Sequence, residues 1–185
     1  ASYVFTFLCR FYLTEPNSSA ASSNPDIKMP IPVPLIETLN RFSVVIVTGG
    51  SSGIGCSIIK AINKLVPSAK LCNLSRSKPD IFLGENGVHL PTDLSDPAQL
   101  KASAEKLRQI IAEAPTGEVL LVNNSGLGDY GPIQDLELSK QLEMIDLNIR
   151  AVVDLTAQLL PQIRERGGAV MSFASTAAFQ PTPYL

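Results

Sequence analysis

A short stretch at residues 44–55, VVIVTGGSSGIG, constrains the fold more than any other part of the chain. Its four consecutive β-branched residues predict a buried strand, and the glycines that follow predict a tight turn into a helix. Glycine lets a ligand's phosphates approach the backbone, and the start of the helix offers them N–H groups and a positive dipole end. The stretch therefore predicts a cradle for a dinucleotide pyrophosphate. Its candidate contacts are Gly49, Ser51, Ser52, Gly53, Ile54 and Gly55.

Strand and helix patterns alternate along the rest of the chain. Further strands are expected at residues 69–75, 88–90, 118–122 and 169–174, and helices at 53–66, from Ser95 or Asp96 to 114, and at 139–166. Such alternation requires a parallel sheet with right-handed crossovers. We expect an α/β fold, a three-layer Rossmann-type doubly wound parallel sheet. Its predicted strand order is 3-2-1-4-5, and the sheet is expected to be incomplete at the C-terminus.

Two of the expected helices carry apolar residues at helical spacing. In the helix at 53–66 the predicted apolar face consists of Ile54, Ile58, Ala61, Ile62 and Leu65. In the helix at 139–166 one stripe consists of Leu142, Ile145, Ile149, Val152, Thr156, Leu160 and Ile163. Both patterns are typical of amphipathic helices.

The expected domain is a partial NAD(P)-binding domain at residues 41–185. Residues 1–40 combine an apolar, aromatic start with a linker rich in serine and proline, so we expect this extension to be disordered. The chain begins with Ala1 and stops at Leu185, directly after a Pro-Thr-Pro-Tyr run. We therefore expect that both ends have been cut or are incomplete.

Composition excludes several classes of function. The net charge of −2 offers no electrostatic footprint for nucleic acid or an anionic membrane, and no apolar run is long enough to span a bilayer. The three cysteines lack CxxC spacing, which predicts neither a zinc site nor a disulfide framework. His89 is the single histidine, so a histidine triad or a multi-histidine metal site is not expected. A reducing, cytoplasmic setting is the default.

Candidate ligand-binding residues follow each expected strand. In a doubly wound sheet ligands bind at the carboxyl ends of the strands. Besides the glycine turn, these ends carry Arg76, Asp93, Asn124, Ser125, Gly126 and Ser175. A lone glycine-rich turn would be weak evidence, whereas suitable residues at five strand ends predict one shared dinucleotide site.

The end of the second strand bears on which cofactor is preferred. An acidic residue about twenty positions after the glycine turn hydrogen-bonds a ribose 2′-hydroxyl, whereas a basic residue accommodates a 2′-phosphate. Ser75 and Arg76 occupy this place, and neither is a carboxylate. The sequence therefore favours NADP(H), with NAD(H) as the other possibility. The alternative for Arg76 is a solvated loop residue.

Residues 43–185 resemble the short-chain dehydrogenases/reductases. Residues 48–55 match the family's TGxxxGxG motif, and Asp93-Leu94 matches the position that lies beside the adenine ring. Residues 123–126 resemble the NNAG motif, with Ser125 in place of alanine. Asn148 and Ser175 match the asparagine and serine of the catalytic tetrad. The resemblance implies that Asp93, Leu94, Asn124, Ser125 and Gly126 contact the cofactor.

The resemblance also implies a reaction, namely hydride transfer between a nicotinamide and a carbonyl or secondary alcohol. A serine would stabilise the substrate oxygen, an asparagine would support a water, and a tyrosine with a lysine four positions later would move the proton. Ser175 and Asn148 take the first two roles. Tyr184 comes too soon after Ser175 for the third, and no lysine can follow it. We therefore expect that the chain binds cofactor but lacks the catalytic tyrosine–lysine pair.

The expected partners are a small carbonyl or alcohol substrate and, in the full-length protein, further copies of the chain. Family members usually associate through the helix that corresponds to residues 139–166, which implies an outward apolar face. The alternative function is a nucleotide-binding regulatory or scaffold module without catalysis. The presence of Asn148 and Ser175 argues against it, because a pure binder needs neither residue.

Overall fold

The computed structural model describes residues 37–81 and 83–175. Within these ranges all strands form one parallel sheet with the order β3-β2-β1-β4-β5, which confirms the predicted Rossmann-type α/β fold. The strands are β1 (Phe42–Thr48), β2 (Lys70–Ser75), β3 (Val88–Pro91), β4 (Glu118–Asn123) and β5 (Ala169–Ser172). Residues 1–36 and 176–185, with the predicted linker and Tyr184, lie outside the described residues.

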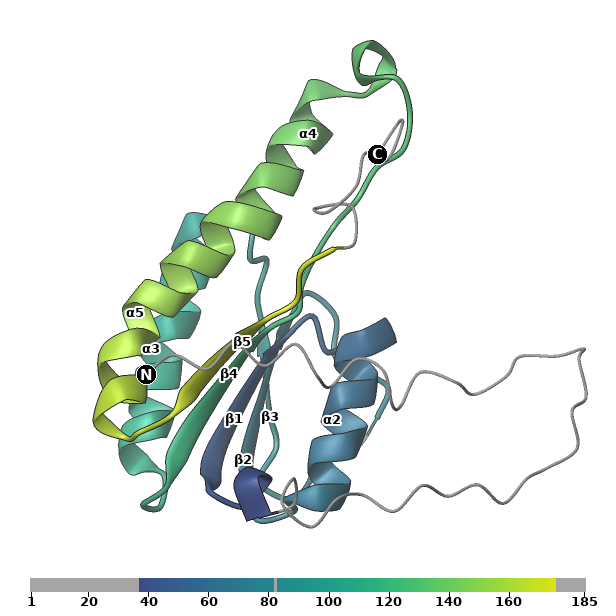
Figure 1. Cartoon of the computed structure of the whole chain (residues 1–185). Coiled ribbons are helices and arrows are strands. Elements are labelled where there is room, and N and C mark those ends of the chain that lie inside the picture. The colour runs from purple at the N-terminus through teal and green to yellow at the C-terminus, as the bar shows by residue number, and fades with distance from the viewer. Residues whose placement is uncertain (1–36, 82, 176–185) are drawn as a thin grey trace, which may run out of the picture.

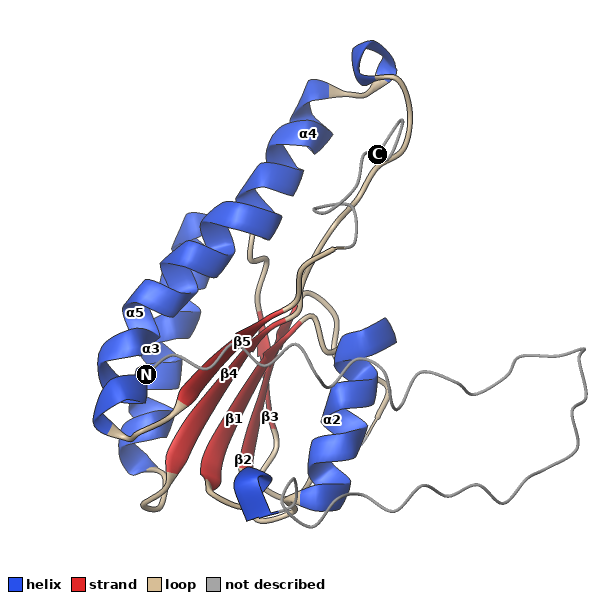
Figure 2. Ribbon diagram, in the orientation of Figure 1, coloured by secondary structure: helices blue, strands red, loops and turns tan. Residues whose placement is uncertain are grey.

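Helices cover both faces of the sheet (Figure 1). Helix α2 (Gly53–Leu65) lies on one face, and α3 (Pro97–Glu113) and α5 (Ala151–Glu165) lie on the other (Figure 2). A single turn η1 (Ile133–Asp135) precedes α4 (Leu138–Ile145), which continues through the π-helical turn η2 (Asp146–Arg150) into α5. The α4 end of this rod extends past the carboxyl ends of the strands (Figure 1). Among the described helices, none combines the length and apolar character needed to cross a membrane.

The central strand β1 is buried on both faces, which explains its unbroken apolar run. Val44 and Ile46 pack in the cluster that includes α3 and α5, whereas Val45 and Val47 pack in the cluster that includes α2. All four side chains are fully buried. Leu39, which precedes the predicted domain start, is also buried, in the cluster with α2.

The predicted apolar face of α2 is wrong at its first residue. Ile54 is 39% exposed, whereas Ile59, which the prediction omitted, is fully buried. Gly55, Ile59 and Ile62 are the buried positions of this helix. Ile54 lines a cleft beside the glycine turn, so it faces the ligand side of the sheet rather than the core.

The rod formed by α4, η2 and α5 buries a side that differs from most of the stripe identified in the sequence. Its buried residues are Ala151, Leu155, Leu159 and Ile163, and only the last of these belongs to the predicted stripe. Leu142, Ile145, Ile149 and Leu160 of that stripe are exposed. Both sides of the rod carry apolar residues, so periodicity alone does not reveal which side meets the sheet.

The start of α3 is fixed by Asp96 rather than Ser95. The Asp96 carboxylate accepts hydrogen bonds from the backbone N–H groups of Ala98 and Gln99, at 2.8 and 3.3 Å. A bond from the Gln99 side chain, followed by these backbone bonds, lowers the pKa of Asp96. Such an N-cap satisfies donors that the first helical turn leaves unpaired.

A side-chain contact between Asn73 and His89 joins β2 to β3. Asn73 Oδ1 accepts the Gly50 N–H at 2.9 Å, which turns the amide nitrogen toward His89 Nδ1, 3.1 Å away. An amide nitrogen only donates, so His89 Nδ1 must be the unprotonated acceptor. Burial, the largest cause, lowers the pKa of His89 below its ordinary value.

We predict that His89→Asn reduces the loss of stability on mild acidification. A lowered pKa favours the neutral imidazole in the folded state, so the unfolded chain binds the proton first as pH falls. The stabilisation is complete above the unfolded pKa of about 6.5 and is lost as pH falls from there through the folded pKa. Urea unfolding between pH about 7.5 and 5 should give a flatter free-energy profile for the variant than for the parent chain. Identical slopes would contradict the prediction.

Candidate functional site

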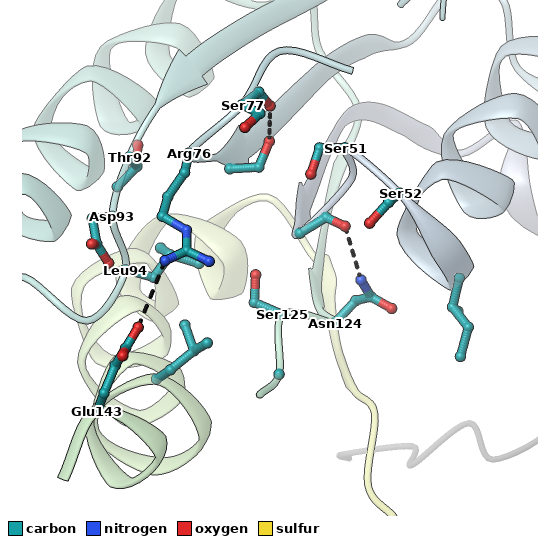
Figure 3. Close-up of a pocket in the computed structure, with 15 residues that line it drawn as sticks. Ser51, Ser52, Arg76, Ser77, Thr92, Asp93, Leu94, Asn124, Ser125 and Glu143 are labelled. Carbon is teal, nitrogen blue, oxygen red and sulfur yellow. Dashed lines mark hydrogen bonds and ion pairs between the residues drawn. The ribbon is translucent and has the colours of Figure 1, made fainter. Parts of the chain in front are cut away.

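A cleft opens across the carboxyl ends of the strands, between the sheet and the α4–η2 segment (Figure 3). Its volume is about 380 Å³. The walls come from the glycine turn, from the segments after β2, β3 and β4, and from the helical rod. The lining residues are Gly49, Ser51, Ser52, Ile54, Ser75, Arg76, Ser77, Thr92, Asp93, Leu94, Asn124, Ser125, Gly126, Glu143 and Leu147.

The predicted contacts mostly meet in this cleft. Ten of them line it, and the exceptions are Gly53, Gly55, Asn148 and Ser175. The glycines act on the shape of the turn instead. A Cβ on Gly55 would lie 2.3 Å from the Gly49 carbonyl oxygen, so glycine is required for α2 to approach the turn.

Gly49 and Gly53 have backbone φ angles of +70° and +54°, which disfavour other residues. A Cβ on Gly49 would also lie 2.7 Å from Ser125 Oγ, whereas a Cβ on Gly53 would meet nothing within 4 Å. Gly53 is therefore needed for its conformation, and Gly49 is needed for both its conformation and the space beside it.

The start of α2 is suited to an anion. Ser52 is its N-cap but makes no side-chain capping bond, and the first turn carries no acidic residue. The first N–H groups of a helix have no acceptor within the helix, and together with the dipole they attract negative charge. The Ser51 and Ser52 side chains lie at this end of the cleft (Figure 3).

The glycine turn is joined to β4 through Thr48 and Asn124. Thr48 Oγ1 accepts the backbone N–H groups of Asn124 and Ser125 at 2.9 and 3.0 Å. Asn124 Nδ2 donates to the Thr48 carbonyl oxygen at 3.0 Å and to that of Gly49 at 3.4 Å. The Asn124 amide thus holds the turn, and direct contact with a cofactor stays a prediction for it.

Asn73 is a site residue that the sequence analysis missed. Its amide accepts from Gly50 N–H and donates to Ser75 Oγ at 2.9 Å, and Ser75 Oγ donates to the Ser77 carbonyl oxygen at 2.8 Å. This chain connects the glycine turn with the segment that carries Arg76. The signal was a polar amide inside an otherwise apolar strand, where a fully buried asparagine needs partners.

The third strand end supplies Asp93 and Leu94. Asp93 Oδ1 accepts bonds from the Ser95 N–H at 3.0 Å and from its hydroxyl at 2.6 Å, which fixes the carboxylate at the rim. Leu94 is 4% exposed, so most of its side chain packs in the core while its remaining surface lines the cleft.

Arg76 extends across the cleft toward Glu143, a second residue that the sequence analysis missed (Figure 3). Arg76 Nη1 lies 3.6 Å from Glu143 Oε1, and the side chains are 68% and 36% exposed. Glu143 is one of several charges along a helix, so its position on this wall depends on how the rod crosses the sheet. Nothing local in the sequence distinguishes it.

Asn148 and Ser175, the two predicted catalytic residues, lie in η2 and after β5. Asn148 lies in η2, where its side chain accepts the Leu127 N–H at 2.9 Å and donates to the Leu127 carbonyl oxygen at 2.7 Å. It therefore holds the loop after β4. Ser175 is exposed and follows β5 as the last described residue. Their catalytic roles remain predictions.

Comparison with known proteins identifies relatives of this architecture. A dehydrogenase from Cochliobolus heterostrophus, RED2, is 29% identical over 161 residues, which cover 80% of this chain and 58% of the relative. The L-sorbose reductase of Gluconobacter frateurii, solved with NADPH and L-sorbose, has 28% identity and a TM-score of 0.66 over 77% of this chain and 56% of its own. A short chain dehydrogenase from Leptospira borgpetersenii with bound NAD+ has 17% identity and a TM-score of 0.67, over 91% of this chain and 61% of its own, and shows the fold alone.

The chain spans about half the length of the curated relatives that it matches, between 46% and 59%. The family described as short chain dehydrogenase matches residues 43–185, which is most of the chain and includes every described strand except the first residue of β1. With the strand order, the glycine turn and the cleft at the strand ends, this match is decisive: the chain belongs to the short-chain dehydrogenase/reductase family of NAD(P)-dependent oxidoreductases.

Proposed function

We propose that this chain binds NADP(H) in preference to NAD(H), and that the cofactor serves hydride transfer between nicotinamide and a carbonyl or secondary alcohol carbon once a catalytic tyrosine–lysine pair completes the site. The observation that carries the proposal is the cleft, onto which the glycine turn, the uncapped start of α2 and Arg76 all open. A phosphate-binding end and a cationic side chain therefore face the same space.

The lining residues fit a dinucleotide by their chemistry. The N–H groups at the start of α2 and the hydroxyls of Ser51 and Ser52 would hold the pyrophosphate, and Arg76 would bind a 2′-phosphate. Asp93 and Leu94 would border the adenine end. When bound, the nicotinamide would donate or accept the hydride. Ser175 would hydrogen-bond the substrate oxygen, and Asn148 would position the loop after β4.

NADP(H) preference rests on the guanidinium of Arg76 and on the neutral side chain at Ser75. A 2′-phosphate gains charge-assisted hydrogen bonds from arginine, whereas a 2′-hydroxyl gains most from a carboxylate. The two solved structures named above contain NAD+ in one case and NADPH in the other, so support for the preference comes from the site itself.

We also propose that the outward side of the α4–η2–α5 rod contacts a second copy of the chain. Leu142, Ile145, Ile149, Val153 and Leu160 on this rod are between 40% and 64% exposed. A continuous exposed apolar stripe marks an interaction surface, and two copies related by a twofold axis would cover the same stripe on each other.

A cytoplasmic location is proposed from the cysteines. Cys56 and Cys72 are free thiols. Burial raises the pKa of the Cys72 thiol to about 12, so this side chain stays protonated and acts as a packed apolar residue. Free thiols are typical of a reducing compartment.

Our first prediction for this function is that Arg76→Gln weakens NADPH binding about tenfold and leaves NADH binding within about twofold. Tenfold is about 1.4 kcal/mol, the lower end for a hydrogen bond to a charged group and suited to an exposed arginine. Fluorescence titration of the 185-residue chain measures both affinities. Lys78→Gln is the matched control, because this exposed lysine lies two residues on and does not line the cleft. Tighter binding of NADH than NADPH by the parent chain would refute the preference.

A second prediction is that the 185-residue polypeptide binds cofactor without turning over carbonyl substrates. Its sequence holds no tyrosine with lysine four positions later, so the proton transfer lacks its expected donor. Absorbance at 340 nm, followed with NADPH and a panel of ketones and aldehydes, should stay at background. Reduction that disappears in Tyr184→Phe would overturn the prediction. A coding sequence that continues past Leu185 with such a pair would favour the enzyme over the non-catalytic regulatory module.

A third prediction concerns association. Val153→Asp should shift the chain toward the monomer, because a carboxylate in the middle of an apolar interface is desolvated without a partner. Sedimentation velocity over a range of concentrations measures the shift. Ser68→Asp adds the same charge at an exposed turn before β2 and should leave association unchanged. A parent chain that stays monomeric at high concentration would contradict the proposed surface.

A further inference from the structure

Arg76 and Glu143 face each other from opposite walls of the cleft (Figure 3). Arg76 follows β2 at the carboxyl end of the sheet, and Glu143 lies on α4, on the opposite wall of the cleft. Their nearest charged atoms, Arg76 Nη1 and Glu143 Oε1, are 3.6 Å apart. The contact joins two elements whose separation sets the width of the cleft.

The charge around this contact is acidic overall. The charged side chains among the lining residues are Arg76, Asp93 and Glu143. Asp93 is held by the Ser95 N–H and hydroxyl, whereas the Glu143 carboxylate is held, within the described part of the chain, by its ion pair with Arg76. A phosphate that enters beside Arg76 therefore meets a guanidinium already paired with a carboxylate.

Resting on the proposed function, we propose that Glu143 is a specificity-determining residue that competes with the cofactor's 2′-phosphate for Arg76. The 2′-phosphate must displace the Glu143 carboxylate from the guanidinium before it can form its own charge-assisted contact there. A cofactor with a 2′-hydroxyl leaves the ion pair in place. Glu143 thus reduces the ratio of NADP(H) affinity to NAD(H) affinity that Arg76 would otherwise provide.

The size of the effect follows from the exposure of the pair. Ion pairs between exposed side chains are weak, and breaking one changes an equilibrium by roughly two- to fivefold. Salt screens such a contact over about 10 Å at 0.1 M, so the effect should shrink as ionic strength rises.

The test compares two isomeric adenine nucleotides that carry their second phosphate at different places. Calorimetric titration of the full 185-residue chain uses adenosine 2′,5′-bisphosphate, whose second phosphate is on the ribose 2′-oxygen, and ADP, whose second phosphate extends the 5′ chain. Glu143→Gln should bind the bisphosphate roughly two- to fivefold more tightly, with ADP affinity unchanged. Glu165→Gln makes the same change at an exposed position near the far end of the same rod and should alter neither affinity.

The double variant Arg76→Gln/Glu143→Gln tests the mechanism. If Glu143 acts by occupying Arg76, the gain from Glu143→Gln disappears once Arg76 is neutral. A gain that persists there would mean simple repulsion and would overturn the proposal, as would a Glu143→Gln variant with unchanged bisphosphate affinity. Glu143→Ala removes the carboxylate without putting an amide in its place, and it should reproduce the result of Glu143→Gln.

The dinucleotide site and the role of Glu143 give different binding results if they are absent. A parent chain that binds neither ADP nor the bisphosphate overturns the dinucleotide site and this inference with it. A parent chain that binds both, while Glu143→Gln and Glu143→Ala leave the ratio of affinities unchanged, keeps the proposed function and overturns the role of Glu143 alone.

Discussion

The hydroxyl of Thr48 joins the two central strands at the point where the cleft begins. It accepts the N–H groups of Asn124 and Ser125 and donates to the Val122 carbonyl oxygen at 3.5 Å. One donor and two acceptor sites are all that a hydroxyl possesses, so its bonding capacity is used completely. Because Thr48 is 3% exposed, water has little access to replace these bonds. The glycine turn and the loop after β4 therefore share one anchor, and the position of each depends on it.

Asn73 provides a second anchor from the other side of the turn. It binds the Gly50 N–H and continues through Ser75 to the segment that bears Arg76. The space around the turn is equally restricted, since a Cβ on Gly50 would lie 2.2 Å from Ile59 and 2.4 Å from Asn73 Oδ1. Packing and hydrogen bonding thus hold the backbone in the conformation that exposes the start of α2. A ligand would meet groups already in place, which reduces the ordering that binding requires.

Much of this arrangement could be predicted from the sequence, because its signals are local. The β-branched run, the glycines and the alternation of strands with helices gave the parallel sheet and the edge where ligands bind. Ten lining residues were found because they directly follow strands or lie in the glycine turn.

The residues that were missed depend on tertiary placement. Glu143 lies on a helix that begins far from the sheet, and the sequence does not specify how that helix crosses the cleft. Asn73 was concealed in a strand pattern that looked uniformly buried, and its partner Gly50 belongs to another element. The burial of Ile59 rather than Ile54 depends on where α2 begins relative to the sheet edge. In each case the contacts of a residue on one element depend on where another element lies.

The π-helical turn η2 has a consequence for how the two ends of the rod are oriented relative to each other. A π-turn accommodates one residue more than an α-helical turn, and each residue of an α-helix advances about 100° around its axis. If the same residues of Asp146–Arg150 were wound as an ordinary α-helix, α4 would be rotated by about that angle relative to α5. Leu155 and Leu159 would keep their places in the core, while Glu143 would leave the cleft wall. The π-turn therefore absorbs an extra residue and keeps the core-facing side of α5 in phase with the cleft-facing side of α4.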